Sequence, residues 1–293
     1  MKNVFLTVFT PTYNRGYVLP RLYQSLCRQT DKDFEWIIVD DGSVDDTSDL
    51  VKGWMRENQV NIKYFYQENS GKPQAHNIGV KKSVAELFVC VDSDDLLTDD
   101  AVKKVKTFWE AEQNNADIIG MVLKRGGIQG EKITSWAQGL LKETFFRAQK
   151  LYSLAGDTML VWRTDILKKV EFPVFANEKF IPEGYLYDKL SNFGKCIFID
   201  EVLYLCEYLP DGYTASMSKV NARNPLGYQA YIKQRLKMDF TFKDKWLDSI
   251  RYVAIKLVNK DGRLFKDTVY PLWTILAYLP GHVLYWKRYK KYC

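Results

Sequence analysis

Five aspartates crowd the end of one apolar stretch, and they are the residues in this sequence best suited to chemistry. The stretch "FVCVDSDDLL" covers residues 88–97 and carries Asp92, Asp94 and Asp95. On a continuing strand, Asp92 and Asp94 would point to the same side, where two carboxylates repel unless a cation lies between them. Oxygen ligands suit Mg²⁺ or Mn²⁺, which also bind phosphate oxygens. The pattern therefore predicts either a divalent metal with a phosphate-bearing ligand or a turn followed by a helix cap.

The last two acids of this group have a simpler explanation. Thr98 has the features of an N-cap for a helix that carries Val102 and Val105 inward. Asp99 and Asp100 then fall in the first turn, where carboxylates favour the positive end of the helix dipole. We expect these two acids to act on the helix and not on a ligand.

Three other groups have side chains that suit a nucleotide. Asp40, at the end of "WIIVD", could accept from a base or a ribose hydroxyl, and Gly42 and Ser43 would let the backbone approach a ligand. Tyr13 could stack on a base, or it could be a packed turn tyrosine. Lys72 precedes a predicted helix start, where a cation and free N–H groups attract an anion. Its alternative is a solvated loop lysine.

The elements that would position these residues alternate between strands and helices in the first part of the chain. Strands are predicted at 3–10, 34–40, 62–67 and 86–92, with helices after each from the spacing of apolar residues. This alternation favours a mostly parallel sheet with helices on both faces. Ligands of such sheets bind beyond the carboxyl ends of the strands. We therefore expect 10–15, 40–43 and 92–95 to converge on one crevice.

The second half is less regular. The pattern predicts a Gly-rich loop or hairpin at 124–132, a strand at 157–162, a short helix at 164–170 and a helix starting near Glu183. A strand pair or one bent strand is predicted at 195–208, and two helices between 226 and 259. The polar segment 208–219 is predicted to be a loop that could close over a bound ligand.

Composition is that of a globular protein. The 293 residues are 46% hydrophobic and 27% charged, which suits one large domain or two small ones. No N-terminal signal peptide is apparent, because the apolar run at 4–10 is short and leads into a turn. The five cysteines lack metal-ligand spacing, so we expect them to be reduced, as in the cytosol.

Positive charge gathers at the C-terminal end. Residues 201–293 contain 16 Lys and Arg against 8 Asp and Glu, whereas the preceding part holds 26 against 28. Nucleic acid or an anionic membrane surface could match this charge. Residues 269–286 carry no charged side chain and are rich in Trp and Tyr, and "KRYKK" follows. These features favour the membrane, and we expect no nucleic-acid partner.

This uncharged stretch is an unfavourable membrane span. A spanning helix needs roughly 20 apolar residues, and Pro271, Pro280 and Gly281 interrupt the stretch. Trp and Tyr side chains suit the headgroup level. The prediction is a hairpin or helix lying on the inner face of the cell membrane, with a buried C-terminal helix as the alternative and a span as the least favoured structure.

Four strings in the first hundred residues resemble the family-2 glycosyltransferases of the GT-A fold. They are "FTPTYNR", "IIVDDGSVDDT", "ENSGKPQAHNIG" and "VCVDSDD", in that order. The resemblance implies an α/β fold with a Rossmann-like, mostly parallel central sheet and a C-terminal helical region. It also implies a nucleotide-sugar donor, usually a UDP-sugar, a Mn²⁺ or Mg²⁺ cofactor and inversion at the anomeric carbon. Enzymes of capsule and exopolysaccharide synthesis are its common bacterial members.

The resemblance also implies roles for individual residues. The uracil would be held near Tyr13 and Asp40, the ribose would meet Asp92, and Asp94 would coordinate the metal on the diphosphate. The residues expected to bind the nucleotide are Thr10, Pro11, Tyr13, Arg15, Asp40, Gly42, Ser43, Lys72, Gln74, Asn77, Asp92 and Ser93. His76 departs from the family, which often has Arg there, and we interpret it as local packing or a donor contact.

The catalytic base is predicted in the second half. Inverting transfer requires one general base for the acceptor hydroxyl, and the family usually places an acidic pair at a helix start. Here "IPEGYLYDKL" offers Glu183, with Gly184 in the place of the second acid. Glu183 is therefore the predicted base and Asp188 the alternative, and a plain helix-start carboxylate is the structural explanation for Glu183.

These features predict three parts and one activity. Residues 1–125 would bind the nucleotide sugar, 126–220 the acceptor, and 221–293 would form C-terminal helices with a membrane-associating tail. The activity would be sugar transfer to a lipid-linked saccharide in cell-surface polysaccharide synthesis. A sugar nucleotidyltransferase is one alternative, although "TPTYNRGYVLP" lacks its Gly-rich basic loop. A non-catalytic sugar-nucleotide-binding partner subunit is the other.

Overall fold

The chain forms two compact units in a computed structural model that describes residues 4–207, 216–238, 241–260, 263–265 and 267–293. Unit 1 comprises Met1–Glu171 and Leu186–Tyr208, and unit 2 comprises Phe172–Tyr185 and Leu209–Cys293. The division into a donor part, an acceptor part and a tail concerns what each part binds, and it stays a prediction.

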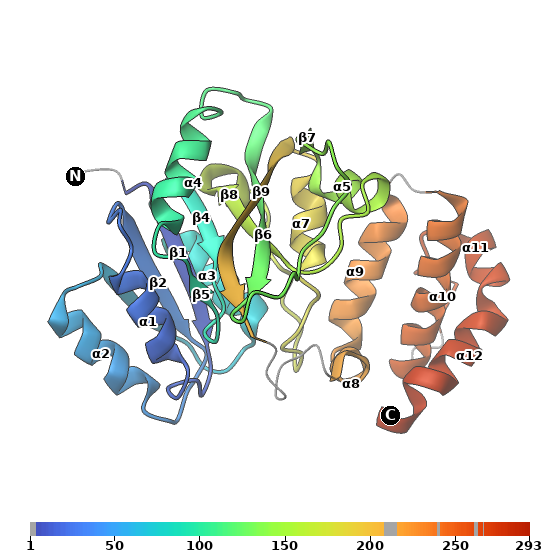
Figure 1. The fold of residues 1–293 in the computed structure, drawn as a ribbon. Helices are drawn as coiled ribbons and strands as arrows, with labels where there is room; N and C mark the ends of the chain where they lie inside the picture. Colours follow the sequence, from blue (N-terminus) through green and yellow to red (C-terminus); the bar gives the residue numbers. More distant parts are fainter. Residues whose placement is uncertain (1–3, 208–215, 239–240, 261–262, 266) are drawn as a thin grey trace. The chain divides into compact units, whose positions relative to one another are not determined.

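Unit 1 is built on a mixed sheet that has nine strands in the part of the chain that the structure describes. The strands are β1 (Leu6–Thr12), β2 (Phe34–Asp40), β3 (Ile62–Tyr66), β4 (Leu87–Cys90), β5 (Leu96–Leu97), β6 (Ile118–Gly127), β7 (Lys142–Glu143), β8 (Thr158–Arg163) and β9 (Lys195–Cys206). Their order is β3-β2-β1-β4-β8-β6-β9-β5, with β7 beside β9 (Figure 1). Strands β1 to β4 are parallel, β8 is antiparallel to β4 and β6, and β9 is parallel to β6.

Helices cover both faces of this sheet. They are α1 (Leu19–Cys27), α2 (Thr47–Glu57), α3 (Lys72–Lys82), α4 (Ala101–Glu110), α5 (Phe145–Leu151), α6 (Thr164–Leu167) and α7 (Gly184–Leu190), which begins in unit 2. Successive strand residues point to opposite faces. Leu6 and Val8 therefore pack with α1, α2 and α4 in one core, while Phe9 contacts His76 of α3 on the other side. The predicted α/β fold with helices on both faces is confirmed.

The second half contains strands that the sequence pattern placed less well. The Gly-rich loop or hairpin predicted at 124–132 begins inside β6, because residues 124–127 pair with β9, and the antiparallel bridge between Gly126 and Lys132 agrees with the hairpin alternative. In the segment predicted at 195–208, β9 forms one long strand from Lys195 to Cys206 with register shifts opposite β6, as in the bent-strand alternative, and Tyr208 lies outside the described residues. The predicted strand at 157–162 is β8 and the short helix after it is α6.

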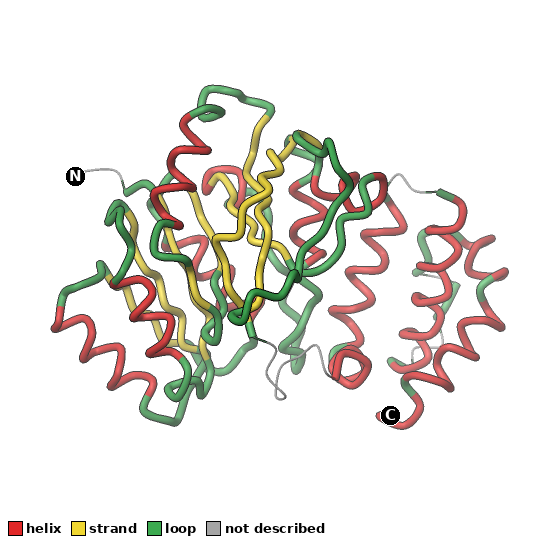
Figure 2. The backbone as a smooth tube through the Cα atoms, in the orientation of Figure 1, coloured by secondary structure: helices red, strands yellow, loops and turns green. Residues whose placement is uncertain are grey.

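From residue 216 onward, the described part of unit 2 consists mainly of helices (Figure 2), whereas its residues 172–183 are irregular. It contains α8 (Met217–Arg223), α9 (Pro225–Lys237), α10 (Phe242–Val258), α11 (Pro271–Leu276), α12 (Tyr278–Arg288) and the 3₁₀ turn η2 (Lys290–Tyr292). Helices α9 and α10 confirm the two helices predicted between 226 and 259. Helix α10 packs against both α9 and α12. Among the described residues, no helix combines the length and apolar character needed to cross a membrane.

Candidate donor site

The acidic string after β4 forms a turn. Strand β4 ends at Cys90, and the N–H of Asp95 donates to the carbonyl of Asp92 at 3.1 Å. The expectation that Asp92 and Asp94 lie on a continuing strand is therefore wrong, because the chain reverses after two more residues. The turn stands at the carboxyl end of the parallel strands, where ligands of α/β sheets bind. Asp92 and Asp94 both remain partly exposed there.

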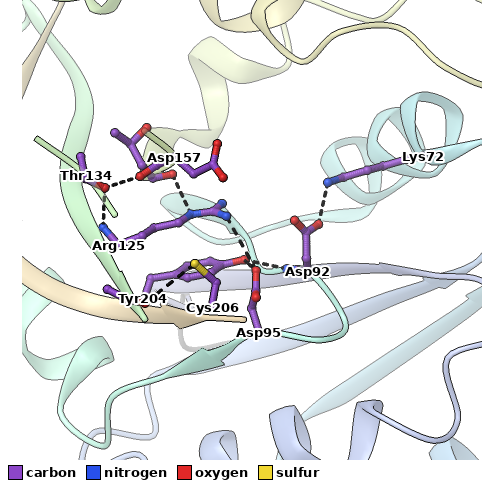
Figure 3. A network of polar contacts seen from close by, with 10 residues as sticks. Lys72, Asp92, Asp95, Arg125, Thr134, Asp157, Tyr204 and Cys206 are labelled. Atoms are coloured by element: carbon purple, nitrogen blue, oxygen red, sulfur yellow. Dashed lines mark hydrogen bonds and ion pairs between the residues drawn. The ribbon is translucent and has the colours of Figure 1, made fainter. Parts of the chain in front are cut away.

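Lys72 reaches Asp92 from the start of α3. Its Nζ lies 2.6 Å from Asp92 Oδ1, and the two side chains are 27% and 31% exposed (Figure 3). The sequence predicted that Lys72 would attract an anion, and the anion that it contacts here is the side chain of Asp92, while contact with a bound phosphate stays a prediction. This ion pair holds a cation and an anion at the rim of the site.

Asp41 fixes the loop that delivers Lys72, a role that the sequence analysis did not assign. Its buried carboxylate accepts hydrogen bonds from the backbone N–H of Ser70 at 2.7 Å and of Gly71 at 2.9 Å. The side chain of Gln67 donates to the same carboxylate at 2.5 Å. Gly71 has φ of +93°, which favours glycine, and it immediately precedes α3. Asp41 therefore connects the end of β2 to Gly71, the residue just before α3.

Side chains from β6 and β9 form a second network of polar contacts with the acidic turn (Figure 3). The N–H of Asp92 donates to Tyr204 Oη at 3.0 Å, and the Tyr204 hydroxyl donates to Asp95 Oδ2 at 2.6 Å. The Arg125 guanidinium lies 3.9 Å from the centre of the Tyr204 ring and 3.7 Å from Asp95 Oδ2. These two residues were missed from sequence, because Tyr204 lies in an apolar run and Arg125 in a segment predicted to be a loop.

Arg125 is itself held by two hydrogen bonds, one from its side chain and one from its backbone. Its Nε donates to the carbonyl of Thr158 at 3.0 Å, and its own N–H donates to Thr134 Oγ1 at 2.8 Å. The Thr134 hydroxyl in turn donates to the carbonyl of Asp157. These bonds leave the guanidinium little freedom beside Tyr204, so its charge acts on the acidic turn from a fixed position.

The three aspartates of the turn differ in their ionisation. Burial opposes ionisation of Asp92, but the charges of Lys72 and Arg125 outweigh it and hold the pKa of Asp92 below its usual range. Burial and the neighbouring Asp92 charge raise the pKa of Asp94. Burial and Asp92 also raise the pKa of Asp95, to about 7. An added cation would therefore favour ionisation of both Asp94 and Asp95, and Asp94 is the more exposed of the two.

The loop after β1 is tied to the loop after β2. The N–H of Asn14 donates to Ser43 Oγ at 2.8 Å, and the Asn14 side chain accepts from the N–H of Val44 at 2.9 Å. Tyr13, one residue earlier, is 47% exposed, as stacking on a base requires. Thr10 is buried within β1 and accepts from Trp36 Nε1 at 2.9 Å. The structure thus brings the first two predicted strand ends together.

Asp40 is fully buried at the end of β2. Its two oxygens accept from the N–H of Ser43 at 2.8 Å and from the Tyr64 hydroxyl at 2.6 Å. Gly42 has φ of +85°, and a Cβ there would lie 2.9 Å from the backbone nitrogen of Asn69. Asp40 and Gly42 therefore shape this turn, and a base contact by Asp40 stays a prediction.

The remaining predicted nucleotide residues line the same loops. Pro11 is half-buried near the end of β1. Arg15 lies in the loop that follows and contributes a positive charge near Asp92 and Asp94. Gln74 and Asn77 lie half-buried on α3, and Ser93 is buried in the acidic turn. His76 packs edge-on against Phe9 and Phe88, with ring centres 5.6 Å apart in both pairs, which is the packing alternative.

The acidic turn fits a divalent metal held partly by the ligand. In the described part of the chain, no three His, Cys, Asp or Glu side chains gather into a metal cluster. Mg²⁺ and Mn²⁺ sites that serve phosphates use one or two carboxylates and complete the shell with water and phosphate oxygens. Asp94, with Asp92 beside it, provides that donor set, and a bound cation would favour the ionised form of Asp94, whose pKa burial and the Asp92 charge raise.

The candidate base and its alternative lie on either side of the boundary between the units. Glu183 belongs to unit 2 and immediately precedes α7, as predicted, with a half-buried side chain. Asp188 belongs to unit 1 and is fully buried within α7. The predicted closing loop at 208–219 lies mostly outside the described residues, which resume at 216.

The sequence matches a known family. The family model described as "Glycosyl transferase family 2" covers residues 7–170, more than half of the chain, including the loops after β1, β2, β3 and β4. The chain therefore belongs to the family-2 glycosyltransferases. Its fold is the GT-A fold, with a mixed, mostly parallel sheet and C-terminal helices.

Curated relatives agree over parts of their length. An uncharacterized glycosyltransferase of Rickettsia conorii is 33% identical over 141 residues, which are 48% of this chain and 23% of that protein. The first relatives in this comparison are matched over 16–37% of their length, far less than the whole. A "GalNAc(5)-diNAcBac-PP-undecaprenol beta-1,3-glucosyltransferase" of Campylobacter jejuni is 28% identical over 232 residues, 76% of this chain and 71% of that protein.

Solved structures share the fold at low identity. Staphylococcus aureus TarS 1-349 in complex with UDP-GlcNAc superposes with a TM-score of 0.64 and 21% identity, over 94% of this chain and 79% of that chain. The mannosyltransferase PcManGT of Pyrobaculum calidifontis, in complex with GDP-Man and Mn²⁺, gives 0.57 and 14%, over 100% of this chain and 83% of that one.

Proposed function

We propose that this protein is an inverting, metal-dependent glycosyltransferase that moves a sugar from a UDP-sugar to a lipid-linked saccharide in the synthesis of a capsule, exopolysaccharide or related cell-surface polymer. The observation that carries the proposal is the acidic turn 92–95, held by Lys72 and Tyr204 at the carboxyl edge of the sheet. It lies within the residues that match the family.

The donor assignment rests on the loops that surround this turn. Tyr13 is exposed for stacking on a base, and the tied loops after β1 and β2 give the base and ribose a fixed wall. Asp92 would accept a hydrogen bond from a ribose hydroxyl once the negatively charged diphosphate attracts Lys72 away from Asp92. UDP is favoured as the nucleotide because the TarS structure contains UDP-GlcNAc, although PcManGT contains GDP-Man.

Transfer would proceed by direct attack of an acceptor hydroxyl on the anomeric carbon. A carbon–oxygen bond forms to the acceptor as the bond to the diphosphate breaks, and the diphosphate leaves with the electron pair. Glu183 accepts the proton of the attacking hydroxyl. Lys72 and Arg15 offset the negative charge of the departing diphosphate. A Mn²⁺ or Mg²⁺ ion held by Asp94 would supply further charge stabilisation when bound.

The acceptor and the cellular location are inferred from a relative and from the tail. The name of the Campylobacter jejuni relative places its acceptor on undecaprenol through a diphosphate. A lipid-linked acceptor would be met at the inner face of the cell membrane, where the basic and aromatic C-terminal end of this chain would bind anionic lipid.

A donor panel tests the function. Purified protein is supplied with Mn²⁺, with individual UDP-sugars or GDP-mannose, and with or without a polyprenyl-diphosphate-linked saccharide. Release of UDP together with a larger lipid-linked product is expected with one UDP-sugar. Release of pyrophosphate from UTP and a sugar phosphate would identify a nucleotidyltransferase instead. Tight UDP-sugar binding without any product would support the non-catalytic partner subunit.

A further inference from the structure

The last two helices of unit 2 expose an apolar stripe. Six side chains of α11 and α12 are between 53% and 74% exposed: Leu272, Ile275, Leu276, Leu279, Val283 and Trp286. The first three share one face of α11 and the last three share one face of α12, because residues three, four or seven positions apart lie on the same side of a helix. Only Ala277 separates the two helices. We call these six residues the α11–α12 face.

The opposite side of the helix pair is the side that packs. Thr274, Ala277, Gly281 and Tyr289 are buried. A Cβ at Gly281 would lie 2.5 Å from Val253 of α10, so this glycine permits close approach of the two helices. An ordinary surface helix buries its large aliphatic residues and exposes its polar ones. Here small and hydroxyl-bearing residues are buried, and the large aliphatic residues face outward.

Only positive charge accompanies this face. No Asp or Glu occurs after Asp267, whereas Lys287, Arg288, Lys290 and Lys291 follow the stripe. All four are exposed. The Nζ of Lys290 lies 2.9 Å from the centre of the Trp286 ring, so cation and aromatic ring stand together at one end of the stripe. Trp beside Lys or Arg is the usual composition at the headgroup level of a bilayer.

We infer that the α11–α12 face docks on an anionic lipid bilayer, with its axis in the plane of the surface. The six apolar side chains would enter the boundary between headgroups and acyl chains, and the four cations would contact lipid phosphates. The longer of the two helices, α12, has 11 residues and is about 17 Å long at 1.5 Å per residue, shorter than the roughly 30 Å of a hydrocarbon core. Its shape therefore suits lying on a membrane and not crossing it.

Charge favours a membrane over a second copy of the chain as the occupant. In a twofold dimer, the same surface of each copy would meet its counterpart. The four cations of each copy would then find no acidic partner on the other copy's face, because α11 and α12 contain no Asp or Glu. An anionic bilayer offers both an apolar layer and the opposite charge. This inference rests on the proposed function only for the lipid-linked acceptor, and it does not depend on the transfer chemistry.

Vesicle flotation of the full chain tests the inference. We expect the protein to float with phosphatidylcholine vesicles that contain about 30% phosphatidylglycerol, and to bind pure phosphatidylcholine at least tenfold less, because the cations supply the attraction. High salt should reduce this binding. The double variant Leu279→Glu with Val283→Glu should lose at least tenfold in vesicle affinity, as should Lys287→Gln with Arg288→Gln, Lys290→Gln and Lys291→Gln.

A matched control separates the face from exposed apolar residues in general. Leu141 and Leu151 of unit 1 are 70% and 60% exposed, and Leu141→Glu with Leu151→Glu should float as the unchanged protein does. Circular dichroism verifies that each variant is folded, as expected for substitutions at exposed positions.

Three outcomes would overturn the inference. The first is no vesicle binding by the unchanged protein, and the second is equal binding by the Leu279→Glu, Val283→Glu variant. The third is a dimer in sedimentation that this variant converts to a monomer, without vesicle binding by either, which would assign the face to a second copy. Flotation needs neither donor nor acceptor, so its failure leaves UDP release unaffected, and a failed transfer assay leaves flotation unaffected.

Discussion

Tyr204 joins Asp92 and Asp95 through one hydroxyl. It accepts the backbone N–H of Asp92 at 3.0 Å and donates to the carboxylate of Asp95 at 2.6 Å. The residue lies on β9, more than a hundred positions further along the chain than the turn it supports. The position of the acidic turn therefore depends on a strand that lies beyond the residues 7–170 matched by the family, and not only on the acidic string itself.

Replacing Tyr204 by Phe should loosen this turn. The N–H of Asp92 and the carboxylate of Asp95 would lose a partner in a largely buried place, and an unmade buried hydrogen bond costs about 1–3 kcal/mol. We expect a drop of this size in the free energy of unfolding, measured with denaturant, and weaker UDP binding in the presence of Mn²⁺, measured by calorimetry.

The same change at an exposed tyrosine is the control. Tyr66 is 62% exposed, and Tyr66→Phe should leave stability and UDP affinity nearly unchanged. If Tyr204→Phe matched Tyr66→Phe in both measurements, the hydroxyl would have no positioning role.

Asp41→Ala should reduce donor affinity through Lys72. The change removes the acceptor for the N–H groups of Ser70 and Gly71, so the loop before α3 loses its fixed course. Lys72 would no longer be held 2.6 Å from Asp92. We expect UDP affinity to fall by about tenfold or more, because one lost charge-assisted hydrogen bond is worth roughly 1.5–3 kcal/mol.

A direct change of Lys72 separates this indirect effect from general unfolding. Lys72→Met should give a similar loss of UDP affinity with little change in the free energy of unfolding, because its ion pair is partly exposed. Full UDP affinity in both Asp41→Ala and Lys72→Met would refute the role of Lys72 in binding the diphosphate.

The first half of the fold was predictable because its signals are local. Each strand from β1 to β4 is a short apolar run that ends in a polar turn, and each helix repeats apolar residues at helical spacing. The parallel arrangement followed from that alternation. It placed Lys72, Asp92 and the loops after β1 and β2 at the same edge of the sheet, and the structure brings them together there.

The support of the site was not predictable, because it depends on pairings between distant segments. Arg125 reaches Tyr204 only because β6 and β9 pair in parallel with two shifts of register near Arg125, and no local pattern encodes such shifts. Tyr204 lies in the apolar run "VLYLC", whose composition indicates a core strand and gives no sign of a polar role. Asp41 had no distinguishing feature beside Asp40, yet it organises the loop before α3.

Asp94→Ala should abolish Mn²⁺-dependent turnover without destabilising the protein. Burial and the Asp92 charge raise the pKa of Asp94, so its ionised form is unfavourable until a cation binds. Removing it should change the free energy of unfolding by no more than about 0.5 kcal/mol. UDP release at saturating Mn²⁺ and thermal unfolding without metal measure the two effects.

Asp99→Ala is the control for this change. Asp99 follows the same acidic string but forms a surface pair with Arg28 at 2.9 Å. Because exposed ion pairs contribute little, both turnover and stability should stay close to those of the unchanged protein. Unaltered turnover in Asp94→Ala would remove Asp94 from the metal site.

Glu183→Gln should reduce the rate of transfer and leave donor binding intact. If Glu183 takes the proton of the acceptor hydroxyl, its loss should lower kcat by about 10²–10⁴, while the dissociation constant of the UDP-sugar stays the same. Glu178 is a structural carboxylate of the same segment, since it accepts the N–H groups of Leu226 and Gly227 at 2.7 Å. Glu178→Gln should therefore act mainly on the free energy of unfolding and much less on kcat.

Asp188→Asn decides between the two candidate bases. Asp188 is fully buried within α7, so a change there should act mainly on the free energy of unfolding. Single-turnover kinetics with saturating donor measure the proton-transfer step without product release. If Asp188→Asn lost the rate and Glu183→Gln kept it, Asp188 would be the base, and the acid before α7 would serve only the helix start.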